Sequence, residues 1–287
     1  MSRTYYRPRS EVPETSLRIQ QYNNLRSLFE TKEWPIEEDM DISIFNRYYH
    51  TLRTLTEEQQ DFLIELSYRF LHVTQASYID YIVPPLKMLR EKYVEEYLYF
   101  IPARTEQNKG KCTSTLTVLY LLRGTTMRTK LDLGVHSVVD DVEQLDECLP
   151  KKKPFKLVIV DDFIGSGQTI VDSLEYLNHS LQREIPPTNI KVICLVAMQD
   201  GIRRLGDMGV EVFSMQICNR GISDYYTGDK LERALDIMKS IEDGIKKLGE
   251  EFRLGYHQSE ALVCMERCPN NTFPIYWKQE RSPYERG

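Results

Sequence analysis

The chain has 287 residues, of which 41% are hydrophobic and 28% charged, and its formal net charge is −6 at pH 7. This composition suffices for a buried core and excludes a largely disordered protein, while the net negative charge argues against broad nucleic-acid binding. The apolar runs are far shorter than the roughly 20 residues that cross a bilayer. We find no secretory signal at the N-terminus, so we expect a cytoplasmic protein with free thiols at its six cysteines and no membrane partner.

Residues 1–92 carry a helical pattern and no catalytic motif. Thr56 followed by Gln59 resembles a capping box, and a single apolar stripe at helical spacing follows it. The pair Pro84-Pro85 is expected to interrupt the next helix or to begin a new one. We therefore predict an N-terminal helical region that packs on the rest of the chain or on a partner.

From residue 93 onward, short apolar runs alternate with helical segments, which is typical of an α/β domain whose sheet is mostly parallel and flanked by helices. We assign residues 93–287 to this domain. The expected strands are 97–101, 157–161, 192–198, 210–215 and 261–265. The expected helices are 113–122, 169–181, 201–208 and 229–248. In such sheets, ligands bind beyond the carboxyl ends of the strands.

One strand-loop-helix segment carries the chemistry. A β-branched apolar run ends in Asp161 and Asp162, a small-residue loop spans Gly165 to Gly167, and a helix begins at about Thr169. Paired carboxylates at the carboxyl edge of a sheet are suited to bind the vicinal hydroxyls of a ribose, or Mg²⁺ through water. The glycines let the backbone approach a ligand closely, and the helix start presents N–H groups to a phosphate. This order of residues indicates a ribose 5-phosphate pocket.

Two common nucleotide-binding motifs fit the chain less well. A P-loop requires Gly-Lys followed by Ser or Thr, whereas Gly110-Lys111 is followed by Cys112, and Thr105 stands where the first Gly should be. A dinucleotide fingerprint requires a third Gly, where this chain has Ile170, and it does not account for two acidic residues. The alternative that stays open is a structural turn in which the acidic residues cap and the glycines turn.

The segment resembles the phosphoribosyl-diphosphate (PRPP) motif of type I phosphoribosyltransferases: four apolar residues, two acidic, three variable, a small residue, Gly, any residue and Thr. The resemblance implies that Asp161 and Asp162 are catalytic and bind the ribose hydroxyls, with Mg²⁺ held by both, directly or through water. It implies a 5-phosphate site formed by Gly165, Ser166, Gly167, Gln168 and Thr169. The diphosphate loop of the family would fall at Arg104, Lys109 and Lys111, although a plain basic loop accounts for these residues nearly as well.

Gly165 departs from the purine-salvage members, which often carry at this position an Asp that handles a proton of the base. This difference argues against hypoxanthine- or guanine-type salvage and leaves other transferase chemistry open. Near the C-terminus, Asn270 and Asn271 are candidates to read the edge of a base, and Phe273 and Trp277 are candidates to stack on it. A rigid loop whose aromatic residues close the core accounts for the same residues equally well.

The order of a helical region, a divergent phosphoribosyltransferase domain and a Pro-Asn-Asn-Thr-x-Pro-Ile-x-Trp ending over 269–277 resembles a bacterial phosphoribosyltransferase-like family. That family occurs in conflict systems, including some retrons and other anti-phage loci. The resemblance implies a toxin-like effector of antiviral defence that binds PRPP or a nucleotide and either transfers a phosphoribosyl group or degrades nucleotides. It also implies a defence-system partner, such as a reverse transcriptase complex, and we leave a homo-oligomer open. The alternative is an inactive module that senses PRPP or a nucleotide and acts through a protein partner.

Overall fold

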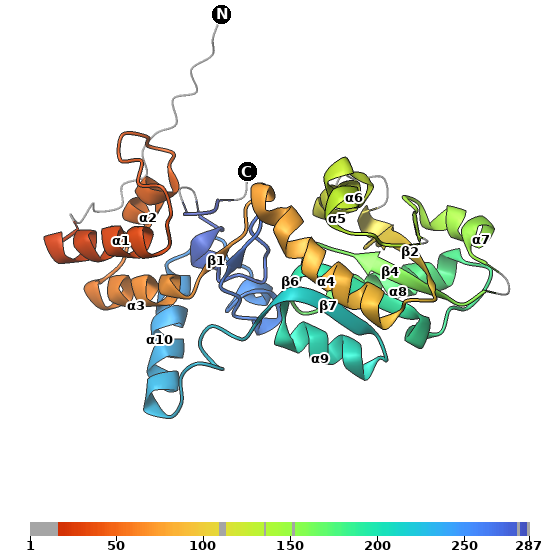
Figure 1. Cartoon of the computed structure of the whole chain (residues 1–287). Helices are drawn as coiled ribbons and strands as arrows, with labels where there is room; N and C mark the ends of the chain where they lie inside the picture. Colours follow the sequence, from red (N-terminus) through yellow and green to blue (C-terminus); the bar gives the residue numbers. More distant parts are fainter. Residues whose placement is uncertain (1–16, 109–112, 135, 151–152, 280–281, 286–287) are drawn as a thin grey trace, which may run out of the picture.

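The structure, a computed structural model, describes residues 17–108, 113–134, 136–150, 153–279 and 282–285 of the chain. Two bodies lie side by side within these residues: a sheet covered by helices, and a group of helices packed against the C-terminal segment, which begins after residue 243 (Figure 1). Among the helices that the structure describes, none combines the length and the apolar character needed to cross a bilayer.

A parallel sheet forms the centre of the first body. Its strands are β2 (Tyr97–Pro102), β3 (His136–Val138), β4 (Phe155–Val160), β5 (Phe163–Ile164), β6 (Ile190–Met198) and β7 (Glu211–Cys218). The strand order is β3-β2-β4-β6-β7, and the short β5 continues along the same edge of β6 that β4 occupies. All nine residues of β6 are buried, which explains why the central strand is an uninterrupted apolar run in the sequence.

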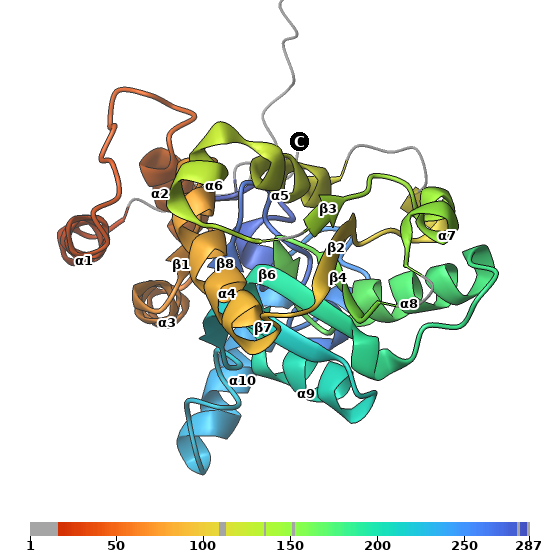
Figure 2. The same cartoon turned by 45° about the vertical axis from the view of Figure 1, so that its right-hand side comes forward.

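Helices cover both faces of the sheet (Figure 2), which confirms the predicted α/β fold. One face carries α4 (Tyr78–Lys92), α5 (Ser114–Arg123) and α6 (Thr125–Lys130). The other carries α7 (Leu145–Cys148), α8 (Gln168–Ser180) and α9 (Gln199–Asp207). Because successive residues of a strand point to opposite faces, Val158 and Val160 of β4 pack on the first side, and Leu157 and Ile159 on the second.

Helix α4 runs unbroken through Pro84 and Pro85, so the predicted interruption at this pair is wrong. Proline removes a backbone donor and is unfavourable inside a helix. The helix persists because Ile82, Leu86 and Leu89 are fully buried against the sheet. Tertiary packing therefore outweighs the local penalty of the two prolines.

The second body contains α1 (Ile19–Thr31), α2 (Ile44–Leu52), α3 (Glu57–Tyr68) and α10 (Asp229–Asp243). The capping box predicted before α3 is confirmed, with the Thr56 and Gln59 side chains each accepting the other residue's N–H. The expected helix over 229–248 is too long, because α10 ends at Asp243 and the N–H of Gly244 bonds to the Ile241 carbonyl in a tighter turn.

The C-terminal segment packs against the N-terminal helices and lies between the two bodies (Figure 1). Strand β8 (Val263–Cys264) falls within the predicted strand 261–265, but it pairs in parallel with β1 (Leu71–His72) and not with the main sheet. Helix α4 belongs to the core of the sheet, whereas α10 shares the core of α1–α3. The hydrophobic packing thus does not follow a single division of the chain at residue 92.

Candidate functional site

The acidic pair sits in a short break between β4 and β5. Asp161 and Asp162 leave the ladder there, and β5 then resumes pairing on the same edge of β6. The N–H of Asp161 donates to the Ile193 carbonyl at 3.0 Å, and the carbonyl of Asp162 accepts the N–H of Leu195 at 3.2 Å. The backbone of both acidic residues is therefore fixed to the central strand at the carboxyl end of β4.

Hydroxyl groups from two helices hold the carboxylates. The Thr115 hydroxyl donates to Asp161 Oδ1 at 3.1 Å, and the Ser114 hydroxyl donates to Asp162 Oδ1 at 2.8 Å. The Tyr78 hydroxyl donates to Asp162 Oδ2 at 3.4 Å. Sequence reasoning missed all three hydroxyl residues. Two adjacent hydroxyls at the start of a predicted helix were the available signal for Ser114 and Thr115, and no local pattern marks Tyr78.

Burial dominates the electrostatics of the pair. It raises the pKa of both carboxyl groups, and the charge of Asp162 raises the pKa of Asp161 further. In the described part of the chain, neither carboxylate has an ion-pair partner, so a bound cation would offset their charge. Two carboxylates match the oxygen ligands that Mg²⁺ prefers. The described residues contain no cluster of three or more acidic, His or Cys ligands, so an ion here would need further oxygens from water or a ligand.

A cavity of about 270 Å³ lies beside the acidic pair and the loop that follows β5. The five loop residues predicted to bind the 5-phosphate, 165–169, all line this cavity. Asp161 and Asp172 line it as well, whereas Asp162 does not. The structure therefore gives the two acidic residues different surroundings: Asp161 accepts one hydroxyl and borders the cavity, whereas Asp162 accepts two hydroxyls and does not border it.

The loop presents backbone donors to this cavity. Gly167, with a φ of +78°, is the N-cap of α8, and a side chain would be strained in that conformation. Among the described residues, no hydrogen-bond acceptor is found for the N–H groups of Ser166, Gly167 and Thr169. Free N–H groups at the positive end of a helix dipole favour a bound anion. Within the residues that the structure describes, the loop thus presents unpaired backbone donors at the start of α8.

Arg204 of α9 holds the loop from behind. Its guanidinium donates to the Ser166 carbonyl at 3.2 Å and to Gln168 Oε1 at 2.8 Å. The Gln168 side-chain amide in turn donates to Asp172 Oδ1 at 2.6 Å. The Gln168 side chain is thus engaged on both sides, and its backbone N–H donates to Ser166 Oγ at 3.4 Å.

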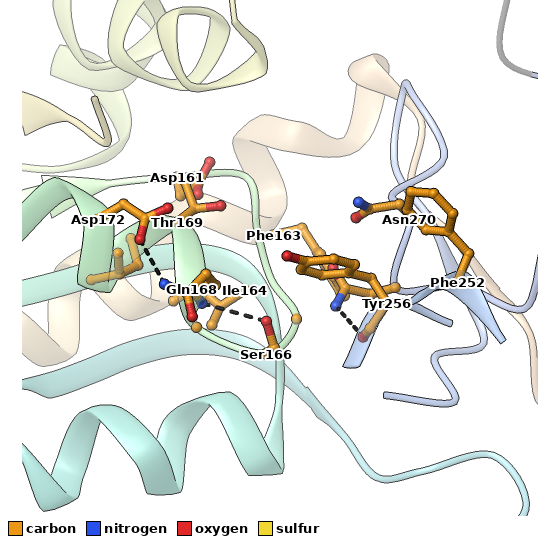
Figure 3. Close-up of a pocket in the computed structure, with 14 residues that line it drawn as sticks. Asp161, Phe163, Ile164, Ser166, Gln168, Thr169, Asp172, Phe252, Tyr256 and Asn270 are labelled. Atoms are coloured by element: carbon orange, nitrogen blue, oxygen red, sulfur yellow. Dashed lines mark hydrogen bonds between the residues drawn. The ribbon is translucent and has the colours of Figure 1, made fainter. Parts of the chain in front are cut away.

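The C-terminal segment forms the opposite wall of the cavity. Figure 3 shows Phe252, Tyr256 and Asn270 facing the loop across the space, and Asn271 completes this wall. The wall touches the loop directly, because a Cβ atom placed on Gly165 would lie 2.1 Å from Asn271 Cγ. Gly165 is therefore required for this close approach, which gives a structural reason for the Gly at this position.

The residues predicted to contact a base are only partly brought together. Asn270 and Asn271 line the cavity, but Phe273 is fully buried in the helical core. Trp277 is also buried there, and its ring packs edge-on against Phe252 at 5.8 Å. The burial of Phe273 and Trp277 favours the alternative in which they close the core. Three aromatic residues do line the cavity: Phe163, Phe252 and Tyr256. Phe252 and Tyr256 were missed because no motif marks the irregular stretch that holds them.

The predicted diphosphate loop is described only at its start. Arg104 follows β2, is largely buried, and has its Nη1 3.7 Å from Asp141 Oδ1. It does not line the cavity of about 270 Å³. Lys109 and Lys111 lie outside the described residues.

Comparison with known proteins points to one family. The family model PRTase-CE matches residues 87–286. No curated protein matches the chain. One similar solved structure is the orotate phosphoribosyltransferase from Aeropyrum pernix, at 17% identity and a TM-score of 0.30, over 61% of this chain and 77% of that one. Another is the hypoxanthine-guanine phosphoribosyltransferase from Schistosoma mansoni in complex with IMP, at 16% identity and a TM-score of 0.28, over 52% and 66% respectively.

Proposed function

Since the chain belongs to the PRTase-CE family, with a phosphoribosyltransferase-like fold, we propose that its cavity binds the ribose 5-phosphate part of PRPP or of a nucleotide. The observation that carries the proposal is the position of Asp161, which lines the same cavity as the loop 165–169 at the start of α8. A carboxylate accepts the hydroxyl protons of a ribose, and the free N–H groups of the loop suit a phosphate.

Magnesium is the cofactor in this proposal. Asp161 and Asp162 would hold it, directly or through water, because their buried charges have no counter-ion among the described residues. The ion would neutralise and orient a bound diphosphate.

The proposed reaction class is phosphoribosyl transfer. The bond between ribose C1 and the diphosphate oxygen breaks, the diphosphate leaves with the electron pair, and an acceptor forms the new bond to C1. Positive charge develops on the sugar as the bond breaks, and the fixed carboxylate of Asp161 stabilises it. Arg104, together with Lys109 and Lys111, is assigned to the leaving diphosphate. With a nucleotide as the substrate and water as the acceptor, the bond between C1 and the base nitrogen would break instead. The base would leave with the electron pair and take up a proton from the water, so the same site would degrade nucleotides to ribose 5-phosphate and free base.

The biological setting is a further part of the proposal. The ending over 269–277 resembles that of a phosphoribosyltransferase-like family from anti-phage loci, which supports a defence effector that depletes nucleotides or modifies a host target. Such an effector would act with a defence-system partner. Nucleotide pools measured by mass spectrometry after expression of wild type and of Asp161→Asn test this: equal pools in both strains would contradict nucleotide depletion.

A sensing module is the second candidate, and one observation favours it. The cavity wall belongs to the C-terminal segment, which shares its core with α1–α3 and α10. A ligand in the cavity would therefore alter the packing of the helical body, as a sensor requires. A sensor binds PRPP without releasing diphosphate, so a diphosphate-release assay separates the two candidates.

Calorimetric titration of PRPP with Mg²⁺ tests the common core of the proposal. We expect binding to wild type, and binding at least about tenfold weaker in Asp161→Asn, as for the loss of a charged hydrogen-bond partner. The matched control is Asp207→Asn, an exposed acidic residue at the end of α9, which should bind like wild type. Absence of binding to folded wild type, or equal affinity in the Asp161 and Asp207 variants, would overturn the assignment.

A further inference from the structure

The cavity wall contains a strained stretch of backbone. Leu254, His257, Gln258 and Glu260 all adopt left-handed conformations, with φ values of 55°, 56°, 53° and 48°. Such conformations are unfavourable for residues with a side chain and persist where surrounding contacts hold them, often at functional sites. Hydrogen bonds within the stretch, such as that from the Glu260 N–H to the Leu254 carbonyl at 2.8 Å, hold it in part, and contacts from other elements add to them.

A buried carboxylate reaches the strained stretch from α10. Glu242 has no exposed surface, and its Oε1 accepts the N–H of Leu254 at 2.9 Å. Its Oε2 has no hydrogen-bond partner within the described chain. The charged groups around it are Arg253, Asp243 and Glu250. A fully buried carboxylate in which only one of the two oxygens accepts a hydrogen bond is unfavourable for stability. A role in positioning the wall therefore explains Glu242 better than a stabilising role.

The contacts continue from Leu254 to the phosphate loop. The N–H of Tyr256 donates to the Asn270 carbonyl at 2.9 Å, and the Asn271 side-chain amide donates to the Tyr256 carbonyl at 3.2 Å. Asn271 in turn packs against Gly165. Since the buried face of α10 packs in the core of α1–α3, an unbroken series of contacts joins the helical body to the loop.

We propose that Glu242 is a positioning residue that fixes the cavity wall to α10, so that ligand affinity at the cavity depends on how α10 packs against α1–α3. The inference deepens the proposed function and rests on it for the identity of the ligand. A protein partner that displaces α10 would thereby withdraw Tyr256 from the loop and weaken binding.

The protonation of Glu242 should make closure of the wall depend on pH, which a passive structural role of Glu242 would not do. Burial raises the pKa of Glu242 to about 7, against the opposing effects of the Leu254 N–H and Arg253. In an opened wall the carboxyl group is hydrated and loses its proton at lower pH. The closed wall therefore binds the proton more tightly, and closure weakens as the pH rises through the neutral range.

Hydrogen exchange of residues 252–261, corrected for intrinsic rates, tests the inference in the full chain. In wild type, exchange should become faster between pH 6 and pH 8. Glu242→Gln keeps an oxygen for Leu254 and should remove this pH dependence. Glu242→Ala should exchange about tenfold faster and bind PRPP with Mg²⁺ correspondingly more weakly, as for the loss of one hydrogen bond to a charged group. The matched control is Glu251→Gln, an exposed acidic residue beside the wall, which should retain the wild-type profile.

Two results would overturn the inference: the same pH profile in wild type and Glu242→Gln, or unchanged exchange in a folded Glu242→Ala. If Glu242→Ala does not fold, the comparison of wild type with Glu242→Gln decides alone. If wild type does not bind PRPP, the proposed function fails, while the exchange profile still decides the role of Glu242.

Discussion

Burial of Asp161 disfavours its charged form, whereas the proposed ligand binding requires that form. Burial and the neighbouring Asp162 raise the pKa of its carboxyl group, so the charged form at neutral pH destabilises the unliganded fold. Asp161→Asn removes the charge and keeps an oxygen for the Thr115 hydroxyl. We therefore expect a higher melting temperature than wild type without ligand, measured by differential scanning fluorimetry, together with a smaller shift on adding PRPP and Mg²⁺. A lower melting temperature without ligand would contradict the account of uncompensated charge.

Glu242 should make the stability of the protein depend on pH. Burial raises its pKa from 4.5 to about 7, so the unfolded chain loses this proton at lower pH than the folded one. The free energy of unfolding should consequently fall as the pH rises from about 4.5 to about 7, by an upper value of about 3 kcal/mol. Glu242→Gln should remove this part of the loss, and a slope of the same sign should remain from Asp161 and Asp162, whose pKa values burial also raises.

Urea unfolding of wild type and Glu242→Gln at several pH values measures this effect. We expect the two stability curves to converge at low pH and Glu242→Gln to be the more stable at pH 8. Parallel curves over the whole range would show that the Glu242 carboxyl titrates normally in the folded protein.

Residues that act through contiguous sequence were the predictable ones. The acidic pair Asp161-Asp162 and the loop after it could be read directly, because a strand end, a glycine turn and a helix start follow one another in the chain. Tyr78, Ser114 and Thr115 reach the same acidic pair from other elements. Their hydrogen bonds depend on how α4 and α5 lie on the sheet, which no local pattern specifies.

At the level of elements, the contact between the loop and the cavity wall depends on Gly165. Gly165→Ala would place a Cβ 2.1 Å from Asn271 Cγ, so either the loop or the wall must shift. We expect the affinity for PRPP to fall about tenfold or more, because the phosphate donors move with the loop. Calorimetry measures this change, and an unchanged affinity would show that the wall yields without cost to the site.

Gly206→Ala is the matched control for this change. Gly206 lies in α9, and nothing stands within 4 Å of an added Cβ. Ala is the better helix former, so stability should rise by at most about 1 kcal/mol while the affinity for PRPP stays as in wild type.

The long, buried strands were predictable from the sequence, and the short ones were not. β4 and β6 are buried apolar runs, and the sequence placed both within a residue or two of their ends. β3 and β5 were missed, because two or three residues carry no periodicity. The prolines of α4 misled local reasoning, since burial against the sheet keeps that helix intact.

At the scale of the whole molecule, residues on either side of position 92 bury each other's apolar side chains. A fragment of residues 93–287 would lack α4, which covers the sheet, and α1–α3, which cover the buried aromatics Phe273 and Tyr276. We expect this fragment to lack a sharp thermal transition and to bind a hydrophobic dye, whereas the full chain unfolds cooperatively. Circular dichroism and dye fluorescence measure the difference. A fragment that folds cooperatively and binds PRPP would establish residue 92 as a domain boundary.

The α/β class and the resemblance to type I phosphoribosyltransferases were predictable for residues 93–287, and the family match over 87–286 supports that resemblance. The packing of the N-terminal helices against the C-terminal segment was not predictable. It depends on pairing β1 with β8 and on burying Tyr276 beside α3. Contacts between such distant segments leave no periodic trace in a single sequence.

The contact between these distant segments affects how the chain folds during translation. Ser67 and Tyr276 share a hydrogen bond of 3.0 Å although they stand 209 positions apart. The ribosome releases α1–α3 long before it adds the segment that covers them, so their core stays open during most of translation. The cavity wall belongs to that same late segment. A nascent chain therefore has no finished cavity, and a product of premature termination before this segment would lack the cavity wall.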